Sequence, residues 1–256
     1  MARDSRSQSG SSGSLSYTPA PGEGPVPRTL EFIRTKLPAW RDDPTRPSDP
    51  SEKRLNSSLC DFLDSRARSD FPMVRFKHES PQTKSRTIDM AVHGTGEVTL
   101  IGAHGYTIYE PFLVIEAKRL PAPSKDRERE YVTGTDKARR GVTGGIQRFK
   151  LGLHGANVES AVIIGYVERL SVHYWHATIN QWIADLVGKA SSDGCVWGKS
   201  DTLDRLICDD QQETSIAASN HQRSGTCLTS SIRIHHLWVV MNSENRGLPR
   251  PSSADS

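Results

Sequence analysis

Apolar residues recur along this chain with two different periods, and the period changes several times between residues 29 and 240. Some stretches carry apolar side chains three or four positions apart, which is the spacing of one helical face. Others, such as residues 112–115 and 161–167, are unbroken apolar runs typical of strands buried on both faces. The pattern therefore predicts helices and buried strands within one domain.

The predicted elements follow one another as helix, strands, helix, strand, helix and strand. This order indicates the α/β class, with a mixed central β-sheet flanked by helices. The helices are predicted over residues 29–40, 49–63, 144–153 and 179–187, and the strands over 71–79, 86–92, 97–102, 111–118, 161–167 and 232–240. The polar stretch 191–226 is expected to be irregular, with one short helix at 203–208.

The two ends of the chain differ in composition from the middle. Residues 1–28 are rich in Ser, Gly, Pro and Arg, so residues 1–45 are expected to form a disordered arm and linker with a short docking helix. Residues 46–241 form the predicted domain, and residues 242–256 are expected to be a flexible tail.

The helix that opens the domain carries a strong start signal. Asp49 suits the N-cap, Pro50 the first helical position and Glu52 the third position. Glu52 also lies on the same helical face as the apolar stripe that follows it, so it has two possible roles. It is either the acidic member of a capping box or a functional carboxylate that reaches the sheet.

Composition narrows the class of protein. Hydrophobic residues make up 35% of the 256 residues, and no run approaches the ~18 apolar residues of a membrane span. The N-terminal stretch lacks the apolar core of a secretory signal, so a cytoplasmic location is expected. The four cysteines form no C-x-x-C pair and are expected to be reduced thiols.

The histidines do not predict a metal site. His173 and His176 have a spacing that fits a strand end or a turn, and the adjacent His235 and His236 should face opposite sides of a strand. An H-N-H nuclease or a histidine-bound zinc ion is therefore not expected.

Positive charge is concentrated in one part of the chain. The formal net charge is only +3, but residues 118–150 contain ten basic and four acidic residues and carry +6. A phosphate-rich partner would be attracted there. The alternative is an ordinary solvated loop, since the charges of residues 126–130 alternate in sign.

Three charged residues interrupt apolar strands. Asp89 lies between Ile88 and Met90, and Glu116 and Lys118 follow the apolar run 112–115. Charge beside buried strands is costly unless it is paired or binds an ion. Because strand side chains alternate, Glu116 and Lys118 point to the same side. Two carboxylates and a lysine suit a Mg²⁺ site that hydrolyses phosphodiesters.

Glu52 on a helix, Asp89 on a hairpin strand and Glu116-Ala117-Lys118 on an apolar strand resemble the PD-(D/E)XK nuclease superfamily, which has the restriction-endonuclease-like fold. The resemblance covers about residues 50–170. Ile88 stands where many members have Pro, and residues 94–108 form an insertion between Asp89 and Glu116. Gln147 matches a subgroup signature whose Tyr is replaced here by Leu151.

The resemblance implies a role for each motif residue. Asp89, Glu116 and the Ala117 carbonyl would ligate Mg²⁺, for which Mn²⁺ would substitute, and Glu52 would complete the site. Lys118 would orient or activate the attacking water, with its pKa lowered beside the metal. The residues expected to contact nucleic acid are Arg119, Arg139, Arg140, Gln147 and Arg148; Gln147 and Arg148 could equally form the solvated face of their helix.

The resulting expectation is a metal-dependent nuclease that acts on DNA, with relatives in restriction, repair and antiviral defence. A protein partner could supply target recognition or activation, and cleavage of both strands of a duplex would favour a homodimer. Two alternatives remain open: a non-catalytic nucleic-acid-binding or scaffold protein on the same fold, and a nuclease that is silent until a partner activates it.

Overall fold

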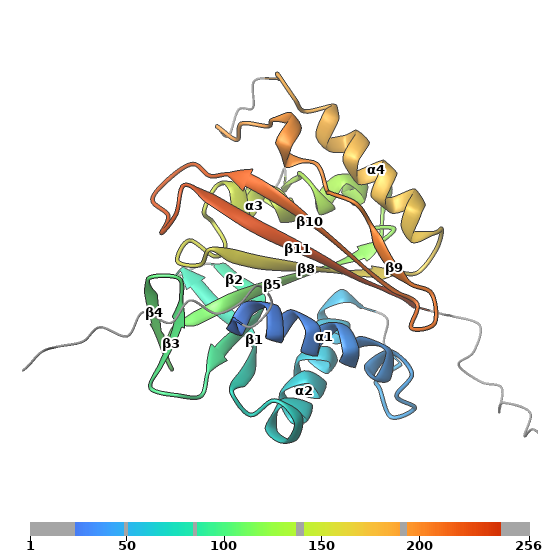
Figure 1. The fold of residues 1–256 in the computed structure, drawn as a ribbon. Coiled ribbons are helices and arrows are strands. Elements are labelled where there is room, and N and C mark those ends of the chain that lie inside the picture. Colours follow the sequence, from blue (N-terminus) through green and yellow to red (C-terminus); the bar gives the residue numbers. More distant parts are fainter. Residues whose placement is uncertain (1–23, 49–50, 84–85, 137–140, 190–193, 242–256) are drawn as a thin grey trace, which may run out of the picture.

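A seven-stranded mixed sheet with helices on both faces forms the centre of the computed structural model (Figure 1). The structure describes residues 24–48, 51–83, 86–136, 141–189 and 194–241. The expected mixed α/β class with a helix-flanked central sheet is confirmed. The predicted arm at 1–23 and tail at 242–256 lie outside the described residues.

The strand order of the sheet is β1-β2-β5-β8-β11-β10-β9. The β5–β8 and β8–β11 pairs are parallel and the other four are antiparallel. Two small hairpins, β3–β4 and β6–β7, lie outside this sheet. The strands are β1 (Val74–Thr83), β2 (Arg86–Gly94), β3 (Val98–Ile101), β4 (His104–Thr107), β5 (Pro111–Leu120), β6 (Thr135–Asp136), β7 (Gly141–Val142), β8 (Ser160–Val167), β9 (Ile207–Asp209), β10 (Thr214–Gln222) and β11 (Ser231–Val240).

The helices form two layers. In Figure 1, α1 and α2 lie on one side of the sheet and α3 and α4 on the other. Because β5 and β8 are covered on both faces, nearly every side chain along them is buried, as their apolar runs predict. The helices are α1 (Pro25–Arg41), α2 (Glu52–Asp70), α3 (Gly145–Lys150) and α4 (Val172–Ala184), with short 3₁₀ helices η1 (Lys125–Tyr131) and η2 (Lys199–Asp201).

The N-terminal helix is longer than the sequence indicated. Residues 25–28, predicted to be disordered, form the first turn of α1, where Pro25 suits a helix start. Leu30, Ile33 and Leu37 bury one face of α1 in the core. Arg41 forms an ion pair with Glu213 at 2.8 Å and donates to the Val240 carbonyl at 3.3 Å. The first described helix is therefore held against the last strand.

Several other element boundaries differ from the prediction. The polar stretch 191–226 holds two strands, β9 and β10, so the predicted helix at 203–208 is wrong. His173 and His176 lie on α4, which begins at Val172, rather than at a strand end. The other predicted strands and helices are present with shifted ends, α3 being the shortest of them. The polar face of β10 explains why hydrophobic alternation did not reveal it.

A buried chain of hydrogen bonds fills the space between β10, β11 and η2. Ser219 Oγ lies 2.7 Å from His221 Nε2 and 2.8 Å from His236 Nε2. His221 Nδ1 lies 2.8 Å from Asp201 Oδ1, and Tyr131 Oη lies 2.7 Å from His236 Nδ1. Each of these side chains is at most 3% exposed. A polar interior of this kind is stable only because its groups are paired.

The two ends of this series of hydrogen bonds determine which atom donates in each of them. Trp238 Nε1 can only donate, and it donates to Tyr131 Oη at 2.9 Å. The ionised Asp201 can only accept, and Lys150 Nζ donates to both of its oxygens at 2.8 and 2.9 Å. Between these ends, every group has a hydrogen-bond partner when both histidines are neutral. Burial favours this neutral form, because it lowers the pKa of His221 and of His236.

Two further expectations concern cysteines and membrane spans. None of the four cysteines, all of which are described, forms a disulfide, and Cys60 and Cys195 are buried. Within the described residues, no helix combines the length and the apolar character needed to cross a membrane.

His236 is buried in the chain of hydrogen bonds while His235 lies on the other side of β11, which confirms the expected opposite orientation.

Candidate active site

The candidate site lies where β2 separates from β5. The two strands pair from His93 to Met90, and Met90 lies opposite Ile115. One further step of this register would place Asp89 opposite Glu116, and the next would place Ile88 opposite Ala117. The backbone ladder stops before these positions, and the Ala117 N–H donates to Asp89 Oδ2 at 2.8 Å instead. The carboxylate thus takes the place of a strand carbonyl.

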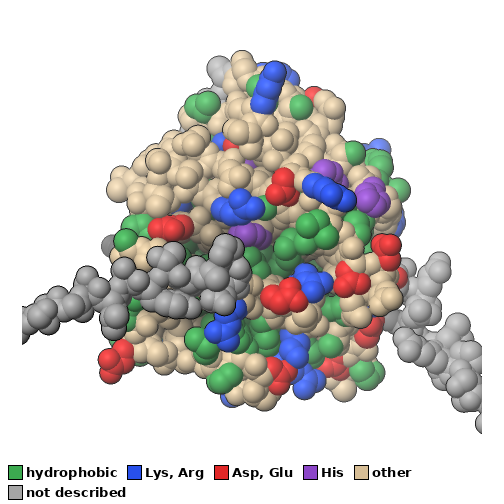
Figure 2. All heavy atoms as spheres, in the orientation of Figure 1, with side chains coloured by type: hydrophobic (Ala, Val, Ile, Leu, Met, Phe, Trp, Pro, Cys, Tyr) green, Lys and Arg blue, Asp and Glu red, His purple; other side chains and the backbone are tan. Residues whose placement is uncertain are grey.

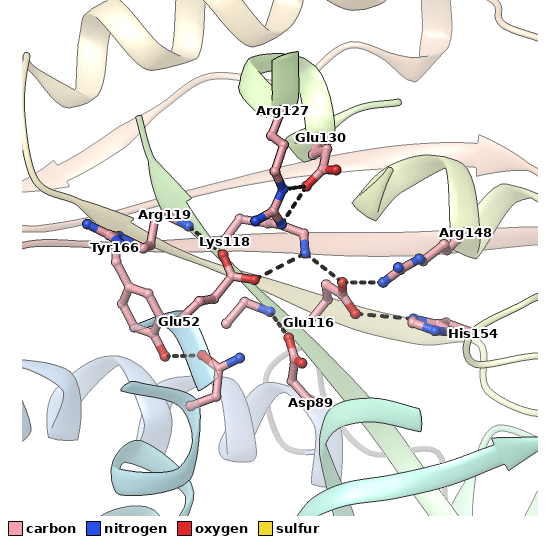
Figure 3. Close-up of polar contacts among 12 residues, drawn as sticks. Glu52, Asp89, Glu116, Lys118, Arg119, Arg127, Glu130, Arg148, His154 and Tyr166 are labelled. Atoms are coloured by element: carbon pink, nitrogen blue, oxygen red, sulfur yellow. Dashed lines mark hydrogen bonds and ion pairs between the residues drawn. The ribbon is translucent and has the colours of Figure 1, made fainter. Parts of the chain in front are cut away.

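This opening leaves backbone oxygen available beside the carboxylates. In an extended strand the N–H and the C=O of one residue point toward the same neighbouring strand. Since the Ala117 N–H points toward Asp89, the Ala117 carbonyl faces the same opening. Continuation of the register would put the Asp89 and Glu116 side chains on one face of the sheet, and the two carboxylates lie near each other in Figure 3.

Glu116 is almost completely buried, with 2% of its surface exposed. Its Oε1 accepts hydrogen bonds from Lys118 Nζ at 2.9 Å and from Arg148 Nη1 at 2.8 Å (Figure 3). His154 Nδ1 lies 3.1 Å from Oε2, but the two atoms are not aligned as a hydrogen bond. Burial alone would raise the Glu116 pKa, but Lys118, His154 and Arg148 outweigh it and hold the pKa well below its usual value.

The pKa of Asp89 shifts in the opposite direction, upward. Burial and the negative charge of Glu116 raise the pKa of Asp89 to about 7. Lys118 and the Ala117 N–H act against this rise without cancelling it. Two carboxylates on one face therefore have very different proton affinities, which is a property of many catalytic pairs.

Lys118 is the cation between these carboxylates. It is 7% exposed, and its Nζ lies 2.9 Å from Glu116 Oε1 and 3.6 Å from Glu52 Oε1. Burial lowers the Lys118 pKa, but Glu116, Glu52 and Asp89 together raise it above its usual value. The protein's own charges therefore raise the Lys118 pKa, and the lowered pKa expected beside a bound metal ion stays a prediction.

Glu52 reaches this cluster from the start of α2. The N-cap of α2 is Ser51, so Glu52 is the first helical residue and not the third residue of a capping box. The predicted cap at Asp49 and Pro50 lies outside the described residues. The Glu52 carboxylate instead faces Lys118, and its Oε2 accepts from the Arg119 N–H at 3.4 Å. Of its two possible roles, the structure favours the one in which it reaches the sheet.

Two further residues complete the cluster, and sequence reasoning gave neither of them this role. Arg148 was expected to contact nucleic acid or solvent, but it contacts Glu116 and donates from Nε to the Val142 carbonyl at 3.1 Å. His154 was not singled out at all. The glycines on either side of it, Gly152 and Gly155, both have positive φ angles, +65° and +60°, and this turn directs a polar side chain into the core.

The other residues expected to contact nucleic acid are differently placed. Arg119 is engaged in a two-point ion pair with Glu168 at 2.7 and 2.8 Å. Gln147 is buried, and its side-chain oxygen accepts from the Gly134 N–H at 2.9 Å, so it does not form a solvated face. Arg139 and Arg140 lie outside the described residues. On the face drawn in Figure 2, basic and acidic side chains are interspersed rather than separated by sign.

The described residues contain no preformed group of three or more His, Cys, Asp or Glu side chains able to hold a metal ion. The oxygen atoms at the opening are nevertheless suited to one. Glu116 Oε2 is a buried oxygen without an aligned hydrogen bond, and Asp89 uses only Oδ2 among the described contacts. Carboxylate and carbonyl oxygens are the ligands that Mg²⁺ prefers. Asp89, Glu116 and the Ala117 carbonyl therefore fit the chemistry of a Mg²⁺ site.

Comparison with known proteins adds no assignment. No protein-family model, no curated protein and no solved structure matches this chain.

Proposed function

We propose that this protein is a metal-dependent nuclease of the PD-(D/E)XK type that hydrolyses phosphodiester bonds. The observation that carries the proposal is the opening of the β2–β5 ladder at Asp89. It brings two carboxylates, a backbone carbonyl and the Lys118 ammonium to one face of the sheet. Two carboxylates of like charge at the end of a central strand pair would destabilise a sheet with only a structural role. Each buried charge costs free energy, and like charges at neighbouring positions repel each other.

Each residue would have a defined part in this reaction. Asp89, Glu116 and the Ala117 carbonyl would hold Mg²⁺, and Glu52 would face it from α2. The bound ion would activate water and offset negative charge on the phosphate. Lys118 carries a full positive charge, held by Glu116 and Glu52, and would stabilise the charge that develops on the phosphate oxygens.

DNA is the substrate class that we propose, with a role in restriction or antiviral defence. The support is the positive charge of residues 118–150, which begin at the site itself and sum to +6. Three of these cations, Arg119, Arg148 and Lys150, are paired with carboxylates outside the stretch. Within this stretch, the exposed Lys125 and Arg129 lie on η1. Phosphate contacts of this kind supply affinity without sequence preference, so target choice would come from a partner.

Cleavage assays with a matched pair of variants test the proposal. We expect the protein to cut plasmid or single-stranded oligonucleotide with Mg²⁺ or Mn²⁺, but not with EDTA. Lys118→Met removes the charge and keeps the length of the side chain, so it should abolish cutting. Lys53→Met changes an exposed lysine on the same helix as Glu52 and should cut normally. Full activity in a folded Lys118→Met protein would refute the mechanism.

One observation favours a second candidate, a nuclease that is silent until a partner binds. Glu116 already has Lys118 and Arg148 on Oε1 and His154 beside Oε2. A metal ion would have to compete with these cations for the carboxylate. Under this alternative, the isolated chain gains thermal stability with Mn²⁺ but cuts nothing. A non-catalytic scaffold would show neither effect.

A further inference from the structure

The face of α2 that points away from the sheet has an unusual composition. The apolar stripe of this helix, formed by Leu55, Leu59 and Leu63, lies on a different face and is buried in the core. The neighbouring face carries Asp61, Phe62 and five arginine or serine residues. These are Arg54, Ser57, Ser58, Ser65 and Arg66.

This face forms one wall of a hollow of about 380 Å³. The opposite wall is the loop after α1, which contributes Thr45, Arg46 and Pro47, and Trp40 of α1 also lines the hollow. The serines leave room where longer side chains would fill the space. A volume of this size is within the range of sites that bind small organic molecules, about 300–1,000 Å³.

Three arginines line the hollow, and two of them are held by aromatic rings. The Arg46 guanidinium lies 4.7 Å from the centre of the Trp40 ring, and the Arg66 guanidinium lies 5.1 Å from the centre of the Phe62 ring. Such stacking restricts the orientation of a guanidinium before any ligand arrives. Arg54 has no ion pair with another described residue.

The acidic residues in the hollow only partly offset this charge. Asp43 and Asp61 line it, so its ionisable side chains sum to +1. Asp43 is occupied locally, because its Oδ1 accepts from both the N–H and the hydroxyl of Thr45, at 2.8 and 2.6 Å. These contacts, with smaller contributions from Arg66 and Arg46, lower the Asp43 pKa, so the carboxylate stays ionised near neutral pH.

We propose that this hollow is a binding site for the phosphate group of a nucleotide. Guanidinium groups oriented by aromatic rings, as those of Arg46 and Arg66 are, recognise phosphate together with neighbouring hydroxyl donors. Ser57 and Ser65 would supply the hydroxyls, because the Ser58 hydroxyl already donates to the Leu55 carbonyl. The phosphate comes from one of two sources, a free mononucleotide or the 5′-phosphorylated end of a strand. Binding here needs neither Asp89 nor Lys118, so the proposal does not rest on nuclease activity.

Calorimetric titration in EDTA tests the site without any cleavage. The ligands are AMP, adenosine, inorganic sulfate, and one short oligonucleotide with and without its 5′-phosphate. The proteins are the wild type, the double variant Arg54→Gln/Arg66→Gln, and the control Arg68→Gln. Arg68 is an exposed arginine of the same helix that pairs with Asp64 outside the hollow. Thermal unfolding of each variant checks that it is folded.

The expected result is phosphate-dependent binding that weakens by about tenfold or more in the double variant and is unchanged in Arg68→Gln. Equal affinity for AMP and the phosphorylated strand identifies a mononucleotide site; stronger binding of the phosphorylated strand identifies a strand-end site. Three outcomes overturn the proposal: adenosine binds as well as AMP, sulfate binds as well as AMP, or a folded double variant binds like the wild type. A chain that binds but never cuts contradicts only the nuclease proposal.

Discussion

Asp89 and Glu116 lie next to the last paired residues of β2 and β5, Met90 and Ile115, and their pKa values shift in opposite directions. The reason is the placement of the cations. Lys118 and Arg148 both donate to Glu116, whereas Asp89 receives only one backbone N–H among the described contacts. The pair therefore holds one permanent negative charge and a second carboxylate that takes up a proton near neutral pH.

Replacement of Asp89 should stabilise the protein at high pH. A raised carboxyl pKa means that the native state binds the proton more tightly than the unfolded chain. The ionised form therefore costs stability, and this cost grows as the pH rises from the unfolded value of 3.8 through about 7. We expect Asp89→Asn to raise the free energy of unfolding by ~1–3 kcal/mol at pH 8 and to have little effect at pH 4.

Urea unfolding of both proteins at the two pH values measures this difference. The same variant should lose all metal-dependent cleavage, because it removes a ligand. Equal stability of the two proteins at pH 8 would mean that Asp89 carries no such cost.

Arg148 should control how strongly the site binds a metal ion. Its guanidinium lies 2.8 Å from Glu116 Oε1 and competes with any cation for that carboxylate. We expect Arg148→Gln to increase the rise in unfolding temperature caused by Mn²⁺, although the variant without metal is less stable. The control is Arg68→Gln, which breaks an exposed pair with Asp64 on α2 and leaves the cluster around Glu116 untouched. A smaller Mn²⁺ effect in Arg148→Gln than in the control would contradict this prediction.

The buried histidines should make the protein sensitive to acid. The pKa values of His221 and His236 are lowered by burial, so the unfolded chain binds protons more readily than the native state. Their contribution to stability is therefore complete above the unfolded pKa of 6.5 and decreases as the pH falls below it. We expect these histidines to lower the free energy of unfolding from about pH 6.5 downward, while the protonation of Asp89 acts in the opposite direction over the same range.

Chemical unfolding from pH 8 to pH 4.5 in an Asp89→Asn background measures the histidine contribution without the opposing effect of Asp89. His221→Gln cannot take up a proton and should show a shallower decline from a lower starting stability. An equally steep decline in that variant would place the acid sensitivity elsewhere.

Close packing between β8 and β11 should make Gly165 intolerant of substitution. Gly165 pairs with Trp238 across the two strands, and a Cβ atom at Gly165 would overlap the Trp238 ring. We expect Gly165→Ala to reduce the free energy of unfolding by ~2 kcal/mol or more. Gly96 has nothing within 4 Å of the same position, so Gly96→Ala is the matched control for denaturant unfolding. Similar stability of the two variants would show that the sheet yields easily at this contact.

Sequence patterns predicted best the elements whose buried side chains are apolar. The runs in β5 and β8 and the stripe of α2 predicted their elements, because these segments pack against hydrophobic neighbours on known faces. The strand β10 was missed for the opposite reason. Its buried positions include Ser219 and His221, whose burial depends on hydrogen bonds to residues far away in the chain. No local pattern contains that information.

The sequence predicted the central residues of the candidate site but not the residues that pack around them. Alternation placed Glu116 and Lys118 on one side of a strand, and the structure brings Asp89 and Glu52 to them. The contacts of Arg148 and His154 with Glu116 could not be derived, because they depend on how α3 and the following turn pack over the sheet. The raised pKa of Lys118 could not be derived either, since it results from three carboxylates in different elements.

The position of α1 has a consequence for synthesis on the ribosome. Arg34 and Arg41 of this helix pair with Asp209 and Glu213, which lie more than 170 positions later in the chain. When α1 emerges, the strands that it covers have not yet been made. α2 and β3, which also contact α1, follow it early in the chain, but the part of α1 that packs against β10 and β11 lacks these partners until both strands are complete. Chaperones therefore have a long interval in which to bind that part.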